Sequence, residues 1–298
     1  MQDETFVSAG RFFKGNIHTH SNKSDGVMSP TEVVSLYRKA KYDFVAITDH
    51  FTQKYGYPIT DTKGFRSSEF TTIIGAELHA PATSIGEKWH ILALGLRQDF
   101  EPPQNDETAV ALARRAASFG AFIAIAHPAW YGLSLEDMQS IDVAHAIEIY
   151  NHRSAVLTAR GDSTCHADQL HSQGRKIGVI AVDDAHFNTD DSLGGFVMVK
   201  SERNTPDALL ESLKAQRFYA SQGPAIRHVQ WNKNDVNIKC SPASVVMVVS
   251  KGSSAAYETG HEITEVTLSL TRVLKHGYGR VVVMDNQGRR AWTNPVWW

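Results

Sequence analysis

The chain has 298 residues, which is enough for one large α/β domain and a small appendage. Hydrophobic residues make up 42% of it, so a full core can form, and the formal net charge of −2 provides no basic field for nucleic acid. The two cysteines, Cys165 and Cys240, form no C-x-x-C pattern, which argues against a thiolate zinc site or a disulfide framework. Because residues 1–5 show no secretory signal and no apolar stretch approaches the ~20 residues of a membrane span, we expect a soluble, cytoplasmic protein without membrane contacts.

Short apolar runs alternate with helical patterns over the first two-thirds of the chain. Several of the runs are near-continuous stretches of Val, Ile and Ala, which is typical of strands buried on both faces of a parallel sheet. The candidate strands are residues 15–18, 44–48, 72–76, 90–95, 121–126, 146–150 and 176–182. One helix is expected to begin at Pro30, where Ser29 and Glu32 form a capping box. Further helices are expected over residues 108–118, 155–173 and 205–216.

Seven strands with intervening crossovers favour a TIM-like (β/α) barrel with one unit fewer than the usual eight, and an open doubly wound sheet is the competing fold. After residue 224 the pattern becomes β-rich and turn-punctuated. The strands expected there are residues 236–239, 245–249, 264–270 and 280–284, with a hairpin turn at 285–288. We therefore expect a barrel domain over residues 1–225 and a small all-β domain over residues 226–298, whose terminal tryptophans pack onto the barrel.

Strand after strand of the predicted barrel ends in a histidine or a carboxylate. The first ends in His18-Thr19-His20, and because a strand holds alternate side chains on one face, His18 and His20 can bind one ion. The strand ends in order give nine candidate metal ligands: His18, His20, Asp25, His50, Glu77, His90, His127, Asp184 and His186. A single histidine at a strand end is more often structural, but independent accidents at five strand ends are far less credible. Closure of the barrel would bring all these ends around one centre.

Imidazole and carboxylate ligands without thiolate suit Zn, Mn or Fe, and nine ligands exceed what one ion can use. Two or three divalent ions that share Glu77 as a bridge fit the count better. Clustered cations lower the pKa of bound water and neutralise an anionic substrate, and a phosphate ester needs both effects. Of the residues nearby, Asp49 is expected to orient an imidazole, Asp183 to point away, and His79 to have a surface or supporting role.

These motifs resemble the PHP domain, named for polymerase and histidinol phosphatase, over about residues 12–225. The matching runs are His18-Thr19-His20, Asp25-Gly26, Ile47-Thr48-Asp49-His50, Gly75-Ala76-Glu77, His90-Ile91-Leu92, Ala126-His127-Pro128 and Asp184-Ala185-His186. The resemblance implies a distorted (β/α)7 barrel with a trinuclear metal centre that acts on phosphoesters. It also implies one ion on His18, His20, Glu77 and Asp184, a second on Glu77, His90 and His127, and a third on Asp25, His50 and His186.

Residues 218–224 and 288–295 resemble the PHP branch that includes carbaryl-hydrolase-like metallohydrolases. This leaves a carbamate, ester or amide hydrolase that uses the same metal cluster as the alternative to a phosphoesterase. A phosphate-facing Arg or Lys would favour the phosphoester, whereas an apolar lining would favour the neutral substrate. Arg153, just past the sixth strand, and Lys88, in a loop at the same face, are the candidate substrate-binding residues.

We therefore predict a metal-dependent hydrolase, most simply a phosphoesterase that cleaves a small phosphate mono- or diester by a metal-activated hydroxide. Asp184 or His186 is placed to help protonate the leaving oxygen. A metal-bearing accessory domain is disfavoured, because a merely structural barrel has no physical need of nine converging ligands. The expected partner is a small phosphoester, with no clear nucleic-acid binding, and the sequence leaves the natural substrate, the metal and the oligomeric state open.

Overall fold

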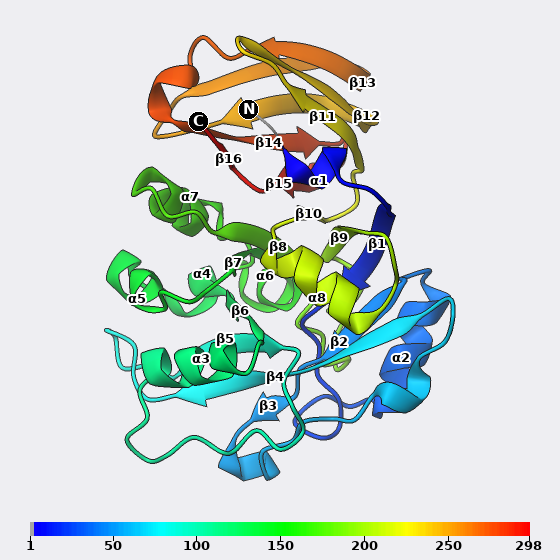
Figure 1. Cartoon of the computed structure of the whole chain (residues 1–298), viewed down its shortest axis with the longest axis vertical. Coiled ribbons are helices and arrows are strands. Elements are labelled where there is room, and N and C mark those ends of the chain that lie inside the picture. The colour runs from blue at the N-terminus through cyan, green and yellow to red at the C-terminus, as the bar shows by residue number, and fades with distance from the viewer. Residues whose placement is uncertain (1–2) are drawn as a thin grey trace.

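The computed structural model describes residues 3–298 and shows a mixed α/β protein (Figure 1). We call the portion from β1 to β10 the α/β part and the portion from β11 to β16 the β-rich part. The strands of the α/β part are β1 (Arg11–Asn16), β2 (Phe44–Ile47), β3 (His50–Phe51), β4 (Thr71–Ala80), β5 (Trp89–Leu94), β6 (Phe122–Ile125), β7 (Ala146–Asn151), β8 (Gly178–Val182), β9 (Phe196–Ser201) and β10 (Phe218–Ser221). The helices are α1 (Glu4–Val7), α2 (Pro30–Lys39), α3 (Ala109–Ser118), α4 (Pro128–Tyr131), α5 (Leu135–Ser140), α6 (His152–Thr158), α7 (Thr164–Ser172) and α8 (Pro206–Lys214), and the 3-10 turns are η1 (Gln53–Tyr55), η2 (Lys63–Phe65) and η3 (Leu274–His276).

Local capping chemistry sets the start of α2 as the sequence predicts. The Glu32 N–H donates to the Ser29 hydroxyl at 3.3 Å, and the Ser29 N–H donates to the Glu32 carboxylate at 2.8 Å. This reciprocal pair satisfies two backbone donors that the first turn leaves without helical partners. The predicted helices at 108–118 and 205–216 are also present, as α3 and α8.

The helix expected over residues 155–173 is two helices, so that prediction was wrong in its continuity. α6 ends where Ala159 adopts a left-handed backbone with φ of 58°, and α7 begins at Thr164. Gly161 lies between them, where an added Cβ would come within 2.4 Å of the Asn151 carbonyl. The break lets the chain return to β7 before α7 begins, which a helical pattern read from the sequence does not reveal.

The seven strands predicted for the barrel are present and lie side by side in one sheet in chain order: β1, β2, β4, β5, β6, β7 and β8. Most neighbours are parallel, but β5 runs antiparallel to both β4 and β6. Residues 81–88 join β4 to β5 as a hairpin loop. The expectation of a crossover at this connection was therefore wrong, because adjacent hydrogen-bonded antiparallel strands need only a short loop.

Two further strands, β9 and β10, extend the sheet antiparallel beyond β1. Within residues 3–298 no ladder joins β8 to β9 or β10, so the sheet is not closed by backbone pairing. The side chain of Asn294 spans this gap. It accepts a hydrogen bond from the Val179 N–H at 2.8 Å and donates to the Gln216 and Phe218 carbonyls at 2.9 and 3.0 Å. A closed (β/α)7 barrel therefore stays a prediction, with Asn294 as the bridge between its edges.

The β-rich part comprises β11 (Ile226–Trp231), β12 (Asp235–Val249), β13 (Ala255–Ser269), β14 (Tyr278–Met284), β15 (Arg290–Thr293) and β16 (Val296–Trp297). The two strands predicted at 236–239 and 245–249 are one strand, β12, whose register shifts near Ala243. Figure 1 shows this part stacked on one end of the α/β part. Because β15 pairs with β10, one sheet runs through both, and the proposed boundary after residue 225 stays a prediction.

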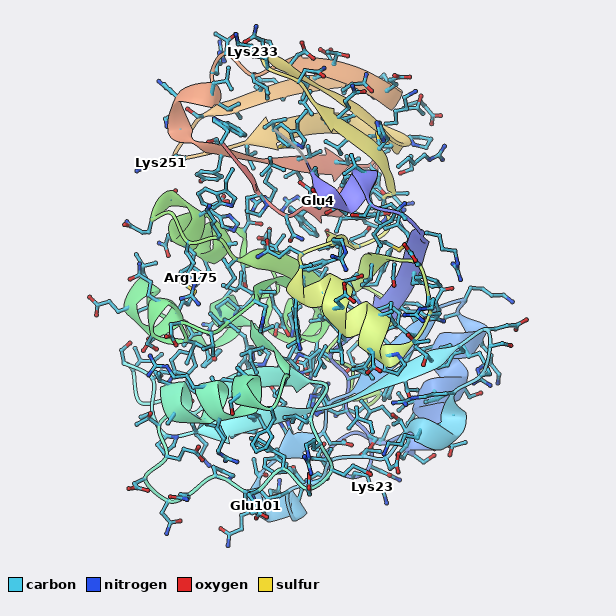
Figure 2. The ribbon with its side chains drawn as sticks, in the orientation of Figure 1. Glu4, Lys23, Glu101, Arg175, Lys233 and Lys251 are labelled. Atoms are coloured by element: carbon cyan, nitrogen blue, oxygen red, sulfur yellow. The ribbon has the colours of Figure 1, made fainter. Side chains whose placement is uncertain are left out.

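The aromatic C-terminus packs onto the α/β part at Trp292, as expected, but Trp298 packs against Trp231 of the β-rich part, so the prediction was wrong for that residue. Trp292 is 1% exposed and belongs to the same core cluster as Ile147 and Val179 of the α/β part. Lys23 and Lys233 lie on the outside of the molecule at opposite ends (Figure 2). No helix within residues 3–298 is long and apolar enough to cross a membrane.

Candidate metal centre

The site begins at the two histidines that follow β1. The regular strand ends at Asn16, and a single bridge between Thr19 and Ala185 continues its direction. The alternation predicted from the sequence holds: Thr19 donates from its hydroxyl to the Ala185 carbonyl at 3.1 Å, while His18 and His20 are fully buried on the other side. The two imidazole Nε2 atoms lie 3.3 Å apart.

The structure brings all nine predicted ligands together and adds His79 as a tenth. Within each of four overlapping groups, every residue offers one ligand atom, and these atoms lie within 4.8 Å of one another. The groups are His20, Asp25, His50 and His186; His50, Glu77, His79 and His90; His18, His127 and Asp184; and His18, His20 and Glu77. Shared members join the four groups into one cluster, which we call the ligand cluster.

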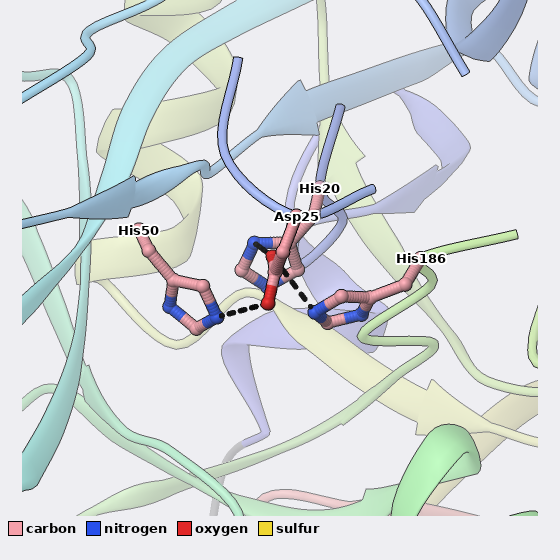
Figure 3. A group of neighbouring side chains, drawn as sticks. All are labelled: His20, Asp25, His50 and His186. Carbon is pink, nitrogen blue, oxygen red and sulfur yellow. Dashed lines mark ion pairs between the residues drawn. The ribbon is translucent and has the colours of Figure 1, made fainter. Parts of the chain in front are cut away.

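Asp25 lies between three rings at the outer end of the ligand cluster (Figure 3). Its Oδ2 is 3.4 Å from His50 Nε2, its Oδ1 is 3.2 Å from His186 Nε2, and the same Oδ1 is 3.9 Å from His20 Nδ1. The loop that carries Asp25 therefore reaches across to ligands that follow β2 and β8.

Glu77 lies at the centre of the ligand cluster. Its Oε1 is 2.8 Å from His90 Nδ1 and 3.1 Å from His127 Nε2, and its Oε2 is 2.6 Å from His50 Nδ1. Burial raises the pKa of this carboxyl, but the imidazoles of His90, His50 and His18 outweigh it and lower the pKa well below its usual range. Glu77 Oε2 nevertheless accepts no well-aligned hydrogen bond, although the side chain is fully buried. A buried carboxylate oxygen without a donor is costly unless a cation satisfies it.

Asp184 faces His18 and His20, and its Oδ1 lies 3.3 and 3.0 Å from their Nε2 atoms. Burial and the neighbouring His186 and His50 lower the pKa of His20 to about 3, so this imidazole is neutral and keeps a lone pair. Lone pairs and carboxylate oxygens therefore converge on the same small volume. This donor set fits divalent metal ions, and the excess of ligands over one coordination sphere fits more than one.

Two members of the ligand cluster have a strained backbone. His127 has a φ of 25° and Asp184 a φ of 57°, a region that side-chain-bearing residues seldom adopt. Strain of this kind persists where the surrounding structure enforces it, and it is concentrated at functional sites.

Sequence reasoning missed Glu148, which supports the ligand cluster from behind. This buried carboxylate lies 2.6 Å from His18 Nδ1 and accepts hydrogen bonds from the His127 N–H at 2.8 Å and the Asn151 amide at 2.9 Å. It thereby sets the orientation of one imidazole and the backbone of a second. The available signal was an acidic residue inside the otherwise apolar run Ala146-Ile147-Glu148-Ile149.

Three neighbouring residues can now be placed. Asp183 points away from the cluster, as expected. Asp49 contacts no imidazole directly: its carboxylate accepts hydrogen bonds from Ser21, Ser24 and Thr60, and the Ser24 hydroxyl lies 3.5 Å from His20 Nδ1, so its expected role in orienting an imidazole runs through Ser24 and stays a prediction. The ring of His79 faces inward, with Nε2 2.8 Å from His50 Nδ1.

A pocket of about 230 Å³ opens onto the ligand cluster. Besides cluster residues, it is lined by Trp130, Arg153, Ser154 and Leu157. The Arg153 Nη1 pairs with Asp191 and donates to the Asn188 amide oxygen at 3.0 Å. Lys88 is exposed on the β4–β5 loop and does not line this pocket, so its role as a substrate contact stays a prediction.

Comparisons with known proteins agree with this geometry. The chain resembles a two-domain protein from Bacteroides vulgatus that contains a predicted PHP-like metal-dependent phosphoesterase, with 16% identity over 99% of both chains and a TM-score of 0.53. A protein from Bifidobacterium adolescentis assigned as a metal-dependent phosphoesterase (15% identity, 61% of this chain and 89% of that one, TM-score 0.44) and an amidohydrolase from Chromobacterium violaceum (15%, 59% and 89%, 0.39) are more distant. No curated protein matches the chain. A family model described as PHP domain matches residues 16–190, more than half of the sequence. The chain therefore belongs to the PHP domain family.

Proposed function

We propose that this protein is a metal-dependent phosphoesterase that hydrolyses a small phosphate mono- or diester. The observation that carries the proposal is the convergence of nine imidazole and carboxylate side chains on Glu77, one oxygen of which has no aligned hydrogen-bond donor. Only an enzyme that uses cations has a physical need for so many buried ligands opening onto a pocket.

Two or three Mn, Zn or Fe ions are the proposed cofactors, bound by the nine predicted ligands with Glu77 as the bridge. Such ions would activate water as the nucleophile and offset the charge of a phosphate. The inward-facing His79 adds a candidate ligand beside His50 and His90.

Asp184 and His186 both line the pocket, and one or the other is the proposed proton donor to the leaving oxygen, a role that requires that no metal ion occupy the donating atom. The His186 Nδ1 is 2.9 Å from the Asp184 carbonyl, which leaves Nε2 directed at Asp25 and the pocket. If His186 donates that proton, His186→Gln should slow esters with basic leaving groups more than nitrophenyl esters. An equal loss on both would remove His186 from this role.

Arg153 is the proposed phosphate contact. Asp191 and Asn188 engage only its Nη1, so the rest of the guanidinium can reach a ligand in the pocket. A guanidinium favours an anionic ester over a neutral carbamate. A preference for neutral carbamates, esters or amides over phosphate esters would instead favour the alternative hydrolase and the carbaryl-hydrolase-like branch. We also propose that residues 1–225 and 226–298 form separate domains. The proposed location of the protein is the cytoplasm.

The test is nitrophenol release by Mn-reconstituted protein from nitrophenyl phosphate, bis-nitrophenyl phosphate and a nitrophenyl carbamate. We expect metal-dependent turnover of at least one phosphate. His18→Ala should abolish this turnover, whereas His261→Ala, at an exposed histidine on β13, should retain it. Turnover of the carbamate with none of either phosphate would move the protein to the alternative class.

A further inference from the structure

The pocket over the ligand cluster has an apolar wall that neither metal binding nor phosphate binding uses. Trp130 and Leu157 line the pocket and are 38% and 52% exposed. Large apolar side chains that stay in water lose free energy that burial against a ligand would recover. An exposed pair inside a metal pocket is therefore a feature to explain.

Trp130 is held against the ligands themselves. It follows His127 in α4, and its ring meets the His127 ring edge-on at a centroid distance of 5.1 Å and the His90 ring at 5.7 Å. The indole therefore lies directly beside two candidate metal ligands, both of which contact Glu77.

Leu157 reaches the same pocket from α6. Leu157 comes four residues after Arg153 and three after Ser154, so it shares a face of this helix with both, and all three line the pocket. The face thus carries a cation in its first turn and an apolar side chain one turn later. Val156, 45% exposed on the same helix, does not line the pocket.

Two further exposed apolar residues lie on loops near the site, although neither lines the pocket. Val27 is 59% exposed, and its N–H donates to the carbonyl of His186 at 2.9 Å. Leu193 is 41% exposed, and its N–H donates to Asp183, next to the ligand Asp184. These contacts place both residues on the segments that carry ligands.

We propose that the substrate is a phosphoester whose organic substituent is an apolar alkyl or aryl group, held between Trp130 and Leu157 while Arg153 and the metal ions take the phosphate. This inference rests on the proposed phosphoesterase function and adds the substrate class. A sugar, polyol or other hydroxyl-rich substituent would leave its polar groups without partners against this wall.

The test measures kcat/KM for methyl, butyl and hexyl phosphate and for glycerol phosphate by phosphate release, and for methyl and hexyl nitrophenyl phosphate by nitrophenol release. Leaving alcohols within the alkyl series have similar basicity, so differences report binding of the chain. We expect kcat/KM to rise at least about tenfold from methyl to hexyl in whichever ester class is hydrolysed, since each buried CH₂ contributes up to ~4-fold. Hexylphosphonate should likewise have a lower inhibition constant than methylphosphonate. This comparison measures binding of the alkyl chain separately from the hydrolytic step.

Leu157→Gln should remove most of the rise in kcat/KM from methyl to hexyl, whereas the matched variant Val156→Gln should keep this rise. A flat series in the wild type, or a preference for glycerol phosphate, would overturn the inference while leaving the phosphoesterase standing. Equal flattening by both variants would also overturn it. Absence of turnover of every phosphoester tested would instead refute the proposed function.

Discussion

Glu77 and Asp183 are both fully buried carboxylates, and the fold treats them in opposite ways. Asp183 accepts hydrogen bonds from the Tyr37 hydroxyl at 2.6 Å and from the N–H groups of Leu193, Gly194 and Gly195 at 2.8 to 2.9 Å. Glu77 has only imidazole nitrogens around it, and its Oε2 has no aligned donor. Burial alone thus does not mark a functional acid: a structural carboxylate has N–H and O–H donors on both oxygens, whereas one that can bind a cation keeps an oxygen without an aligned donor.

The largest expected effect comes from removing the charge at the centre of the ligand cluster. Glu77→Gln should lower turnover on the order of 10²-fold or more, because loss of a bridging ligand exceeds the 10–100-fold typical of groups behind it. Metal analysis should find at least one ion fewer per chain. The metal-free variant should unfold at the same temperature as the metal-free wild type or higher, and a large drop would make Glu77 structural.

Asp183→Asn should show the reverse pattern. The amide puts a donor where backbone N–H groups point, so we expect a loss of about 3 kcal/mol in the free energy of unfolding, measured by urea denaturation. Metal content per folded chain should stay at the wild-type value. Asp106→Asn, at an exposed carboxylate, should change stability by less than about 0.5 kcal/mol. The comparison fails if Asp183→Asn loses metal without losing stability.

Glu148 lies between these extremes, because it contacts a candidate ligand without joining the ligand cluster. Glu148→Gln keeps the shape but weakens the hold on His18 Nδ1, so metal affinity should fall about 10–100-fold. Competition with a fluorescent chelator would measure this. Unchanged affinity would show that the 2.6 Å contact does not orient the ligand.

The last effect is confined to acid pH and concerns His171, a buried imidazole outside the site. Burial and nearby Arg280 lower the pKa of His171 to about 3, so it is neutral when folded, whereas the unfolded chain takes up a proton near 6.5. This contribution is present in full above pH 6.5 and is lost as pH falls toward 3, at up to about 1.4 kcal/mol per pH unit. His171→Gln should weaken the acid sensitivity of unfolding, and His261→Gln should not. Parallel profiles for His171→Gln and wild type would contradict the assignment.

The ligands were predictable from the sequence because most of them lie at or just past a strand end, where chain order and side-chain chemistry are both visible. His18 and Asp184 fall in this class, whereas Glu77 follows only the expected strand 72–76 and lies inside β4, which continues to Ala80. Glu148 was not predictable in this way, since it lies inside a strand and acts through contacts with residues distant in the chain. The way in which Asp49 reaches an imidazole was not predictable, since nothing in the sequence shows that Ser21, Ser24 and Thr60 take up its oxygens or that Ser24 lies beside His20.

The features of the fold likewise separate into those that local sequence predicts and those that depend on distant contacts. Strand positions and the α2 cap follow from local patterns, and the structure agrees with them. The β4–β5 hairpin depends on strand pairing rather than on any local signal, and the break at Ala159 depends on a backbone conformation that alanine seldom adopts. The bridge made by Asn294 joins segments that are more than 70 residues apart in sequence, beyond the reach of periodicity.

The most direct test of the central claim is a Mn titration of chelator-stripped protein, with bound metal and nitrophenyl phosphate or bis-nitrophenyl phosphate turnover measured on the same samples. We predict turnover that is absent without metal and rises to a plateau as two to three ions bind per chain. Full turnover in the stripped protein, or binding of two to three ions with no turnover of either ester, would contradict a metal-dependent phosphoesterase.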